Sequence, residues 1–299
     1  MAKQTTPQGS PATNVTTVQP AAEAAGSALM VIDYGEDAGA GLQDVGRDEI
    51  KIPTFRILQA LSPQCQPVEA GGIEGAKPGM IYNTVTGEMY DGKEGLPFIP
   101  VDRDHNYVEF VPRDAGGGFV AIHDPLEPHI LDKRDVQGKF GKLTGYSEEL
   151  KKPTEIVETR YLYGLVGTDD DTVQAGVVQF TSSQITKYQS FMTRYMSIKY
   201  PNNAGVKIVP PLWAHKWRLR TVYQTGKKGS FYGWLIVLDT EPPLASRMRL
   251  DNPLYIQAKA FYELLKSGAA SIDRDADSKA AEPSEGTAAA GGPDDDIPF

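Results

Sequence analysis

Short runs of apolar and β-branched residues, separated by turn residues, recur along most of this chain. The runs lie at 51–61, 80–82, 88–90, 96–101, 106–111, 156–167, 172–180, 212–224 and 230–239. Runs of this length and composition predict β-strands, and two runs on either side of a short polar turn predict a hairpin. We therefore expect a mainly β fold with a few helices.

Two segments have the 3.6-residue apolar periodicity of an α-helix. The first is 183–199, and Pro201 would end it. The second has Pro253 in its first turn and Gly268 just beyond its end, which is the usual order of these two residues around a helix. Residues 132–152 are polar and contain several glycines, which is typical of an insertion or a long loop.

The charge of the chain is strongly segregated. The whole sequence has a net charge of -9 at pH 7, yet residues 172–238 contain no Asp or Glu and hold all three tryptophans. The basic residues of this acid-free segment are Lys187, Arg194, Lys199, Lys207, Lys216, Arg218, Arg220, Lys227 and Lys228. Positive charge interleaved with aromatic rings is typical of proteins that bind single-stranded nucleic acid. The alternative interpretation is that the rings form a core and the lysines a solvated surface.

The predicted strand 212–224 separates two kinds of side chain, because successive residues of a strand point to opposite faces. One face would carry rings and apolar groups, and the other would carry a row of cations, Lys216, Arg218 and Arg220. Residues two apart on a strand lie about 6.5–7 Å apart, which is close to the phosphate spacing of an extended single strand. We expect this row to contact phosphates, with help from the helix at 183–199.

Composition divides the chain into three regions. Residues 1–49 predict a disordered, partly acidic leader, residues 50–266 a folded domain, and residues 267–299 a disordered acidic tail. No apolar run is long enough to span a membrane. Cys65 is the only cysteine, which excludes an internal disulfide and a cysteine zinc site. These features predict a soluble protein of a reducing cytosol.

Three local patterns are superficially like catalytic or cofactor motifs. The glycines at 116–118 are not followed by a helical pattern. A P-loop or a dinucleotide-binding motif requires a helix at that point, so we exclude both. The aspartates at 169–171 lie at a predicted hairpin tip, where Asp commonly serves the turn. A loose set of residues for a metal-dependent nuclease comprises Asp102, Asp104, His105, His123, Asp124 and His129. Because its spacing is not diagnostic of a site, we expect a protein without catalytic residues, metal or cofactor.

The chain ends in the hexamer Asp-Asp-Asp-Ile-Pro-Phe at 294–299. An aromatic tip behind three aspartates suits a partner's pocket that receives a ring and a terminal carboxylate. The hexamer resembles the C-terminal tip of bacterial single-stranded DNA-binding proteins, and body and tail together are similar to the phage type of these proteins. This resemblance implies an OB-fold-like, partly open barrel with insertions for residues 50–266. It also implies docking of replication or repair proteins by Asp294, Asp295, Asp296, Ile297, Pro298 and Phe299.

The acid-free segment and the tail together predict a sequence-independent single-stranded DNA-binding protein of phage DNA replication, recombination or repair. The expected DNA-binding residues are Lys187, Arg194, Lys199, Lys207, Trp213, Lys216, Trp217, Arg218, Arg220, Tyr223, Lys227, Lys228, Tyr232 and Trp234. Expected partners are single-stranded DNA and, through the tip, a polymerase, helicase or nuclease in the cytoplasm of the host. A strand-annealing recombinase, a nuclease and a virion structural protein are the alternatives, and homo-oligomerisation is left open.

The tail also suggests a hypothesis about regulation. Residues 271–299 hold eight acidic and two basic residues, whereas the acid-free segment is entirely basic. A flexible tether of about 25 residues is long enough to bring the two together. We therefore expect the tail to compete with DNA for the basic segment.

Overall fold

The computed structural model describes residues 51–112, 115–137, 143–167, 172–226, 229–267 and 271–272, with only the backbone described for 51, 133–137 and 271–272. The chain divides into two units, 1–44 and 45–299, and all described residues belong to the second. The expected leader at 1–49 and nearly all of the expected tail lie outside the described residues. The predicted limits of the three regions therefore stay predictions.

Strands make up most of the regular structure. The strands are β1 (Lys51–Ile52), β2 (Thr54–Ile57), β3 (Ile81–Asn83), β4 (Met89–Tyr90), β5 (Leu96–Phe110), β6 (Phe119–His123), β7 (Leu143–Ser147), β8 (Lys152–Gly167), β9 (Val173–Thr181), β10 (Tyr200–Pro201), β11 (Lys207–Ile208), β12 (Trp217–Gly226), β13 (Gly229–Leu238) and β14 (Ser271–Ile272). The α-helices of the described residues are α1 (Pro128–Gln137), α2 (Gln184–Ser197) and α3 (Pro253–Ser267). None of these helices is long and apolar enough to cross a lipid bilayer.

One mixed sheet organises the described residues. Its strands follow the order β13-β12-β5-β8-β9-β2-β3-β4, with β6 paired to β5 and β7 paired to β8. The pair β2–β9 is parallel, and the other pairs in the sheet are antiparallel. Along the described strands the sheet ends at β13 and β4 and does not close into a barrel. The predicted mainly β fold with a few helices is confirmed. The resemblance implied a partly open, OB-fold-like barrel, and the described strands form a mixed sheet without a closed barrel.

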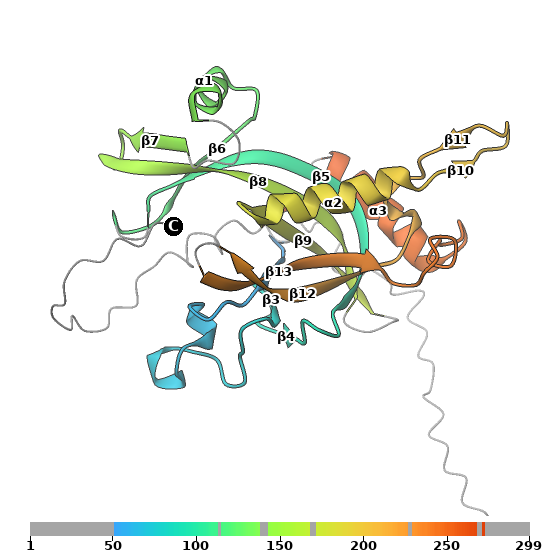
Figure 1. Cartoon of the computed structure of the whole chain (residues 1–299), viewed down its shortest axis with the longest axis horizontal. Helices are drawn as coiled ribbons and strands as arrows, with labels where there is room; N and C mark the ends of the chain where they lie inside the picture. Colours follow the sequence, from blue (N-terminus) through green and yellow to red (C-terminus); the bar gives the residue numbers. More distant parts are fainter. Residues whose placement is uncertain are drawn as a thin grey trace, which may run out of the picture. The chain divides into compact units, whose positions relative to one another are not determined.

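The two long central strands, β5 and β8, have 15 and 16 residues and curve markedly (Figure 1). They pair from Phe98 opposite Val166 to Phe110 opposite Glu155. Their outer ends extend past the rest of the sheet, where β6, α1 and β7 cover them. A small separate core of Tyr107, Ile130, Leu143 and Ile156 holds these parts together. We call β6, α1, β7 and the strand ends that they cover the outer lobe.

Two expectations for this region were wrong. The runs at 96–101 and 106–111 belong to one strand, because the polar link between them keeps its pairing with β8. A register shift between Pro100 and Asp102 marks a bulge, which lets the strand bend and re-aims its side chains. The expected loop at 132–152 instead contains the end of α1, the whole of β7 and the start of β8.

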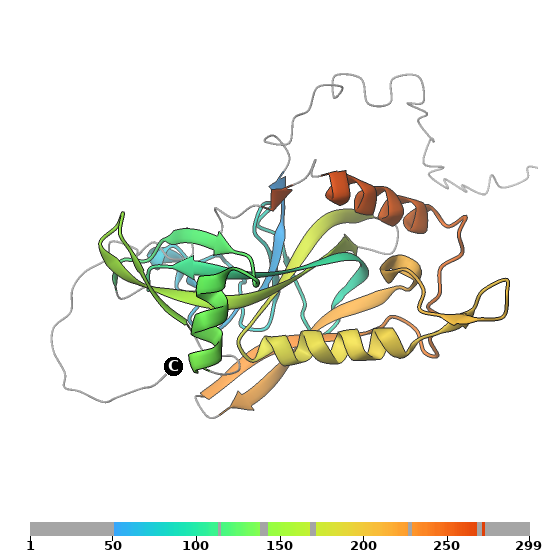
Figure 2. The same ribbon diagram turned by 90° about the horizontal axis from the view of Figure 1, so that it is seen from above.

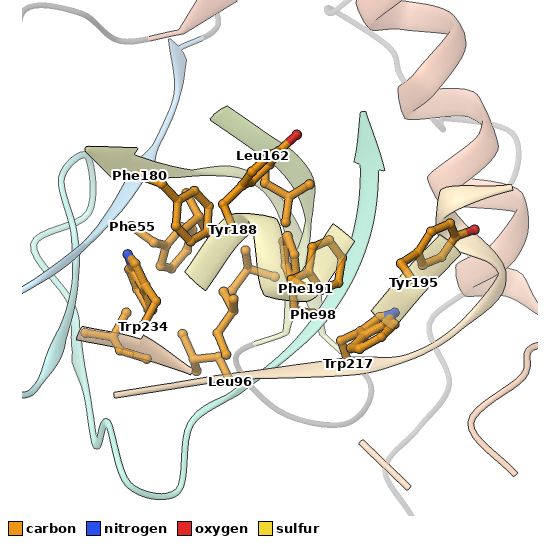
Figure 3. Packing of buried hydrophobic residues seen from close by; sticks show 14 of the residues in the cluster. Phe55, Leu96, Phe98, Leu162, Phe180, Tyr188, Phe191, Tyr195, Trp217 and Trp234 are labelled. Atoms are coloured by element: carbon orange, nitrogen blue, oxygen red, sulfur yellow. The ribbon is translucent and has the colours of Figure 1, made fainter. Parts of the chain in front are cut away.

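The sheet carries one helix on each face (Figure 2). α2 packs Tyr188, Phe191 and Tyr195 into one core, which appears in Figure 3. α3 packs Ala258 and Phe261 into the other core. Because successive residues of a strand point to opposite faces of the sheet, the same strands contribute side chains to both cores. In β8, for example, Leu162 belongs to the α2 core and the adjacent Tyr163 to the α3 core.

The predicted hairpin at 212–239 is confirmed from Trp217 onward. β12 and β13 pair from Trp217 opposite Leu238 to Gly226 opposite Gly229, and β12 joins the sheet by pairing with β5. Residues 212–214 form a 3-10 turn instead of a strand. Pro211 precedes this turn, and proline cannot donate a hydrogen bond to a neighbouring strand. The strand alternation expected at 212–216 therefore does not apply.

The edge of β13 is capped by side-chain amides. Gln59 donates a hydrogen bond from Nε2 to the Tyr232 carbonyl at 2.8 Å, and its Oε1 accepts from the Tyr232 N–H at 2.9 Å. The Trp234 N–H donates to Gln184 Oε1 at 2.8 Å. An uncapped sheet edge is a template for pairing with other chains. These two glutamines satisfy part of that edge and tie the hairpin to the end of β2 and the start of α2.

Candidate functional site

The acid-free segment folds into β9, α2, the arm formed by β10 and β11, and the β12–β13 hairpin. Two of its cations are paired with the first acidic residues that follow it. Both Nε and Nη2 of Arg218 lie 2.8 Å from Asp239 Oδ1, and Arg194 forms an ion pair with Glu241. The sequence therefore overstated the unpaired positive charge of this segment.

The remaining described cations of the segment have no ion pair with another described residue. They are Lys187, Lys199, Lys207, Lys216 and Arg220. Lys199, Lys207 and Arg220 are exposed, whereas Lys187 and Lys216 are half-buried. Lys227 and Lys228 lie outside the described residues. Of the predicted outward row, only Arg220 is both exposed and without such a partner.

Two of the rings predicted to stack on bases belong to the core instead. Trp217 is 0% exposed and Trp234 is 3% exposed, and both pack beneath α2 (Figure 3). The ring centroids of Trp217 and Phe191 lie 4.8 Å apart in an edge-on arrangement. Trp213 packs against Tyr255 and Tyr262 of α3. The assignment of Trp217 as a base-stacking residue is thus corrected, because its ring is enclosed on all sides. Trp234 also belongs to the core, but it lines the cavity described below.

A pair of tyrosines, one exposed and one half-buried, lies near the turn end of the hairpin. Tyr223 is 60% exposed, and it lies directly opposite Tyr232 on the neighbouring strand. Their ring centroids are 5.2 Å apart with an interplanar angle of 64°. The Tyr232 ring lies against Gly79, where an added Cβ would come within 2.5 Å of it. Glycine at that position therefore permits the close approach that fixes the Tyr232 ring.

A cavity of about 490 Å³ lies beside Tyr232, where β2 and β9 end and the outer lobe begins. Its aromatic walls come from Phe55, Phe110, Phe119, Tyr232 and Trp234. Its polar lining comes from Arg56, Gln59, Thr159, Gln179, Thr181, Ser182 and Gln184. We call it the aromatic cavity. Concave sites with aromatic walls and a few converging polar groups are the usual form of ligand and base pockets.

The link from β9 to α2 forms part of the rim of this cavity. Ser182 has a φ of 49°, a left-handed conformation that non-glycine residues seldom adopt. Strained backbone of this kind persists where the surroundings hold it and clusters at binding sites. Gln184, two residues later, is fixed by its hydrogen bond from the Trp234 N–H. The rim is thus held in place from both the sheet and the hairpin.

The predicted DNA-binding residues fall into separate places. Gln184, at the N-terminal end of α2, touches the hairpin near its tyrosine pair. The arm of β10 and β11 projects beyond the opposite end of α2 (Figure 1). A helix of 14 residues is about 21 Å long. Lys199 and Lys207 are therefore separated from the tyrosine pair by roughly the length of this helix.

The acidic and histidine residues that the sequence suggested for a nuclease site lie in two different places. Asp102, Asp104, His105 and Asp124 line a shallow cavity of about 450 Å³ together with Lys266. Lys266 Nζ lies 2.8 Å from Asp102 Oδ2, and this hydrogen bond raises the pKa of Lys266. His105 Nε2 lies 3.1 Å from Glu158, whose pKa is lowered chiefly by that contact. His123 and His129 instead lie together in the outer lobe with Glu127.

No sequence signal identifies most of the residues that line the cavity. Gln59, Gln179 and Phe119 come from three separate elements and have no common motif. Gln59 lies in an irregular segment after β2, and Phe119 begins a strand that the sequence did not predict. Only the folding of the sheet brings them together. Polar residues at the ends of strands were the one available hint, and it is too common to identify a site.

Comparison with known proteins gives one match. The family model described as Pam3 phage gp34-like protein matches residues 22–271, which is most of the chain. No curated protein and no solved structure matches.

Proposed function

Because the chain belongs to the Pam3 phage gp34-like protein family, we propose that it serves phage DNA metabolism as a sequence-independent single-stranded DNA-binding protein. Its place of action is then the host cytoplasm, in replication, recombination or repair. The proposal assigns it a binding role and no catalytic step.

One observation carries the proposal. The hairpin presents an accessible pair of tyrosines, Tyr223 and Tyr232, beside a cavity with aromatic walls. The segment that contains this pair has basic residues and no acidic ones. Unpaired bases stack on accessible rings, and each such contact is worth about 1–3 kcal/mol. A duplex keeps its bases paired and stacked, so this arrangement favours single strands.

The proposed contacts differ from those that the sequence alone predicted. Bases would stack on Tyr223 and Tyr232, with one base entering the aromatic cavity. Phosphates would lie near Lys187 on the first turns of α2 and near Lys227 and Lys228, which follow β12 in the sequence. Arg220 points to the opposite face of β12 from Tyr223 and would contribute less. Arg218 and Arg194 contribute less, because Asp239 and Glu241 already neutralise them.

The tail supplies the partner half of the proposal. Residues 294–299 would dock a polymerase, helicase or nuclease of the replication or repair system through the Phe299 ring and its carboxylate. This assignment rests on the hexamer and its resemblance to the tips of bacterial single-stranded DNA-binding proteins.

A salt titration of the full chain tests DNA binding. Affinity for a fluorescent oligothymidylate is measured by anisotropy between 50 and 200 mM salt, with a duplex of equal length for comparison. If about five phosphates are neutralised, log affinity should fall with log salt at a slope of about −3.5, or roughly a hundredfold over this range. Affinity that is flat with salt, or equal for the duplex, contradicts the proposal. Annealing of complementary strands under the same conditions would favour the recombinase alternative.

A further inference from the structure

The outer lobe holds a cluster that the proposed DNA contacts do not use. His123 ends β6, Glu127 immediately precedes α1, and His129 lies in the first turn of α1. Glu127 Oε2 lies 3.3 Å from His123 Nδ1 and 3.4 Å from His129 Nδ1. Each residue offers one ligand atom, and these three atoms all lie within 4.8 Å of one another. Two imidazoles and one carboxylate form a common ligand set for zinc.

The distances within the cluster match those of a zinc site. With metal–nitrogen and metal–oxygen bonds of about 2.0–2.1 Å, neighbouring ligands of a tetrahedral ion lie about 3.3–3.4 Å apart. Both distances from Glu127 Oε2 have this length. The ligand atoms of all three residues lie within 4.8 Å of one another, and His129, 47% exposed at its side chain, has room to turn its ring toward an ion.

A buried carboxylate orients the first of these ligands. Glu109 of β5 lies 2.7 Å from His123 Nε2, and its own side chain is 11% exposed. Thr154 of β8 donates a hydrogen bond to the other Glu109 oxygen. A carboxylate on the far nitrogen of a ligating histidine fixes the ring and leaves the other nitrogen for the metal. In this arrangement Glu109 leaves His123 Nδ1 directed at Glu127.

Glu127 is also held in place. The Asp124 backbone N–H donates to Glu127 Oε1 at 2.8 Å, which leaves Oε2 between the two imidazoles. Asp124 in turn accepts the Leu126 N–H at 2.7 Å, so the turn that carries Glu127 is closed. Each ligating atom is therefore positioned by a partner outside the ligand set or by the start of α1.

We propose that His123 Nδ1, Glu127 Oε2 and His129 Nδ1 bind a zinc-class divalent cation in the outer lobe, with Glu109 as a positioning residue. The fourth coordination position faces solvent, because Glu127 and His129 are partly exposed. The bound ion would tie the start of α1 to the end of β6. This inference is independent of the proposed DNA binding, and it replaces the expectation from sequence that the chain holds no metal.

Calorimetric titration of the chelator-treated full chain with zinc chloride tests the proposal. We expect saturable binding of about one zinc ion per chain and a rise in Tm when zinc is added. The His129→Ala variant should lose at least about tenfold in zinc affinity and lose the Tm rise, with an unchanged Tm in the absence of metal. Glu109→Gln should weaken binding by about 10–100-fold while leaving one site.

The matched control is His105→Ala, which removes a partly exposed histidine that contacts Glu158 outside the cluster. It should bind zinc as the unchanged chain does. Cobalt in place of zinc should give the intense visible absorption of a tetrahedral site, and His129→Ala should abolish it. The proposal is overturned if no saturable zinc binding occurs, or if His129→Ala binds zinc as tightly as the His105→Ala control. The contacts of the cluster would then be hydrogen bonds that only stabilise the turn.

Discussion

At the scale of single residues, burial separates rings that hold the fold from rings that are free to bind. Trp217 and Tyr223 lie on the same strand face, six residues apart, yet one is 0% and the other 60% exposed. The difference arises because α2 packs on the part of the hairpin that contains Trp217 and not on the part near its turn that contains Tyr223. A strand pattern predicts which face a residue takes, but not how far along the strand the cover extends.

Replacing Tyr223 by alanine should weaken binding of single-stranded DNA and leave stability nearly unchanged. Loss of one stacking ring costs about 1–3 kcal/mol, or roughly 5–150-fold in affinity. Fluorescence anisotropy measures the affinity, and Tyr146→Ala is the matched control, because Tyr146 is also exposed (54%) but lies in the outer lobe. Equal affinities of the two variants would contradict the assignment of Tyr223.

Trp217→Ala should show the opposite behaviour. Removing a buried tryptophan leaves a cavity beneath α2 and destabilises the fold by about 3–5 kcal/mol. Urea denaturation followed by circular dichroism measures this loss. A variant that stays as stable as the unchanged chain would show that Trp217 does not support the α2 core.

His215 makes stability depend on pH. Its side chain is fully buried, its Nε2 lies 3.0 Å from the Tyr200 hydroxyl, and burial followed by the Arg247 charge lowers its pKa to about 4. Between about pH 4 and 6.5 the unfolded chain binds a proton that the folded chain excludes, so stability falls as the pH decreases through this range. The loss reaches about 3 kcal/mol at its lower end.

The His215→Asn variant should lose this part of the pH dependence. Its free energy of unfolding, measured by urea denaturation at pH 7 and pH 4.5, should change less than that of the unchanged chain. An identical change in both proteins would show that His215 does not titrate on unfolding in this range.

At the scale of elements, side-chain amides replace a strand at the edge of the sheet. Gln59 makes the two hydrogen bonds to Tyr232 that a neighbouring strand would make, and Gln184 makes a third to Trp234. The hairpin is thus attached to the sheet on one side through β5 and on the other through two side chains. The two glutamines of the second attachment line the aromatic cavity, so the geometry of the cavity depends on them.

Gln59→Ala should loosen the hairpin. Two backbone groups of Tyr232 lose their partners, which costs about 1–3 kcal/mol in the free energy of unfolding. Hydrogen exchange of the Tyr232 amide and urea denaturation measure the effect. Gln66→Ala is the matched control, since the side chain of Gln66 makes only long hydrogen bonds of 3.4 Å near the surface, and its loss should change stability by less than about 0.5 kcal/mol. Equal stability of the two variants would assign Gln59 no role in holding the edge.

At the scale of the whole molecule, charge is divided between a basic segment and acidic flanks. The acid-free segment contains no Asp or Glu, but Asp239 and Glu241, which follow it closely in the sequence, form ion pairs with two of its cations. The remaining described cations lie in the hairpin or just before it, on the first turns of α2, and beyond the far end of α2. The expected competition of the acidic tail with DNA belongs to this scale, because it needs the full chain.

Deleting residues 294–299 should strengthen DNA binding at low salt and abolish capture of partner proteins. Removal of three aspartates and a carboxylate relieves competition for the cations, and the gain should fade when salt screens the charges to distances of a few ångströms. Anisotropy at 20 mM and 300 mM salt measures this. A chain with Asp294, Asp295 and Asp296 replaced by asparagine should behave like the deletion in DNA binding. Unchanged affinity in both variants would exclude the competition.

The secondary structure of the segments with the clearest apolar periodicity follows from the sequence alone. Local periodicity is a property of neighbouring residues, so the hairpins at 79–90 and 156–180, the hairpin from Trp217 onward and the helices α2 and α3 were all predictable. The family membership rests on the sequence as well. The same local signals wrongly predicted a break between two strands at 102–105. These residues have a polar, loop-like composition, but they pair with β8 and continue strand β5.

The pairing of charges, the burial of rings and the contacts between distant residues become visible only in the folded chain. Arg218 forms an ion pair with Asp239, which follows the other strand of the hairpin, and Glu109 contacts His123 of the neighbouring strand. Such contacts depend on strand register and on the curvature of the sheet, which are set by the packing of the whole core. For that physical reason the aromatic cavity and the histidine cluster could not be found by reading along the chain.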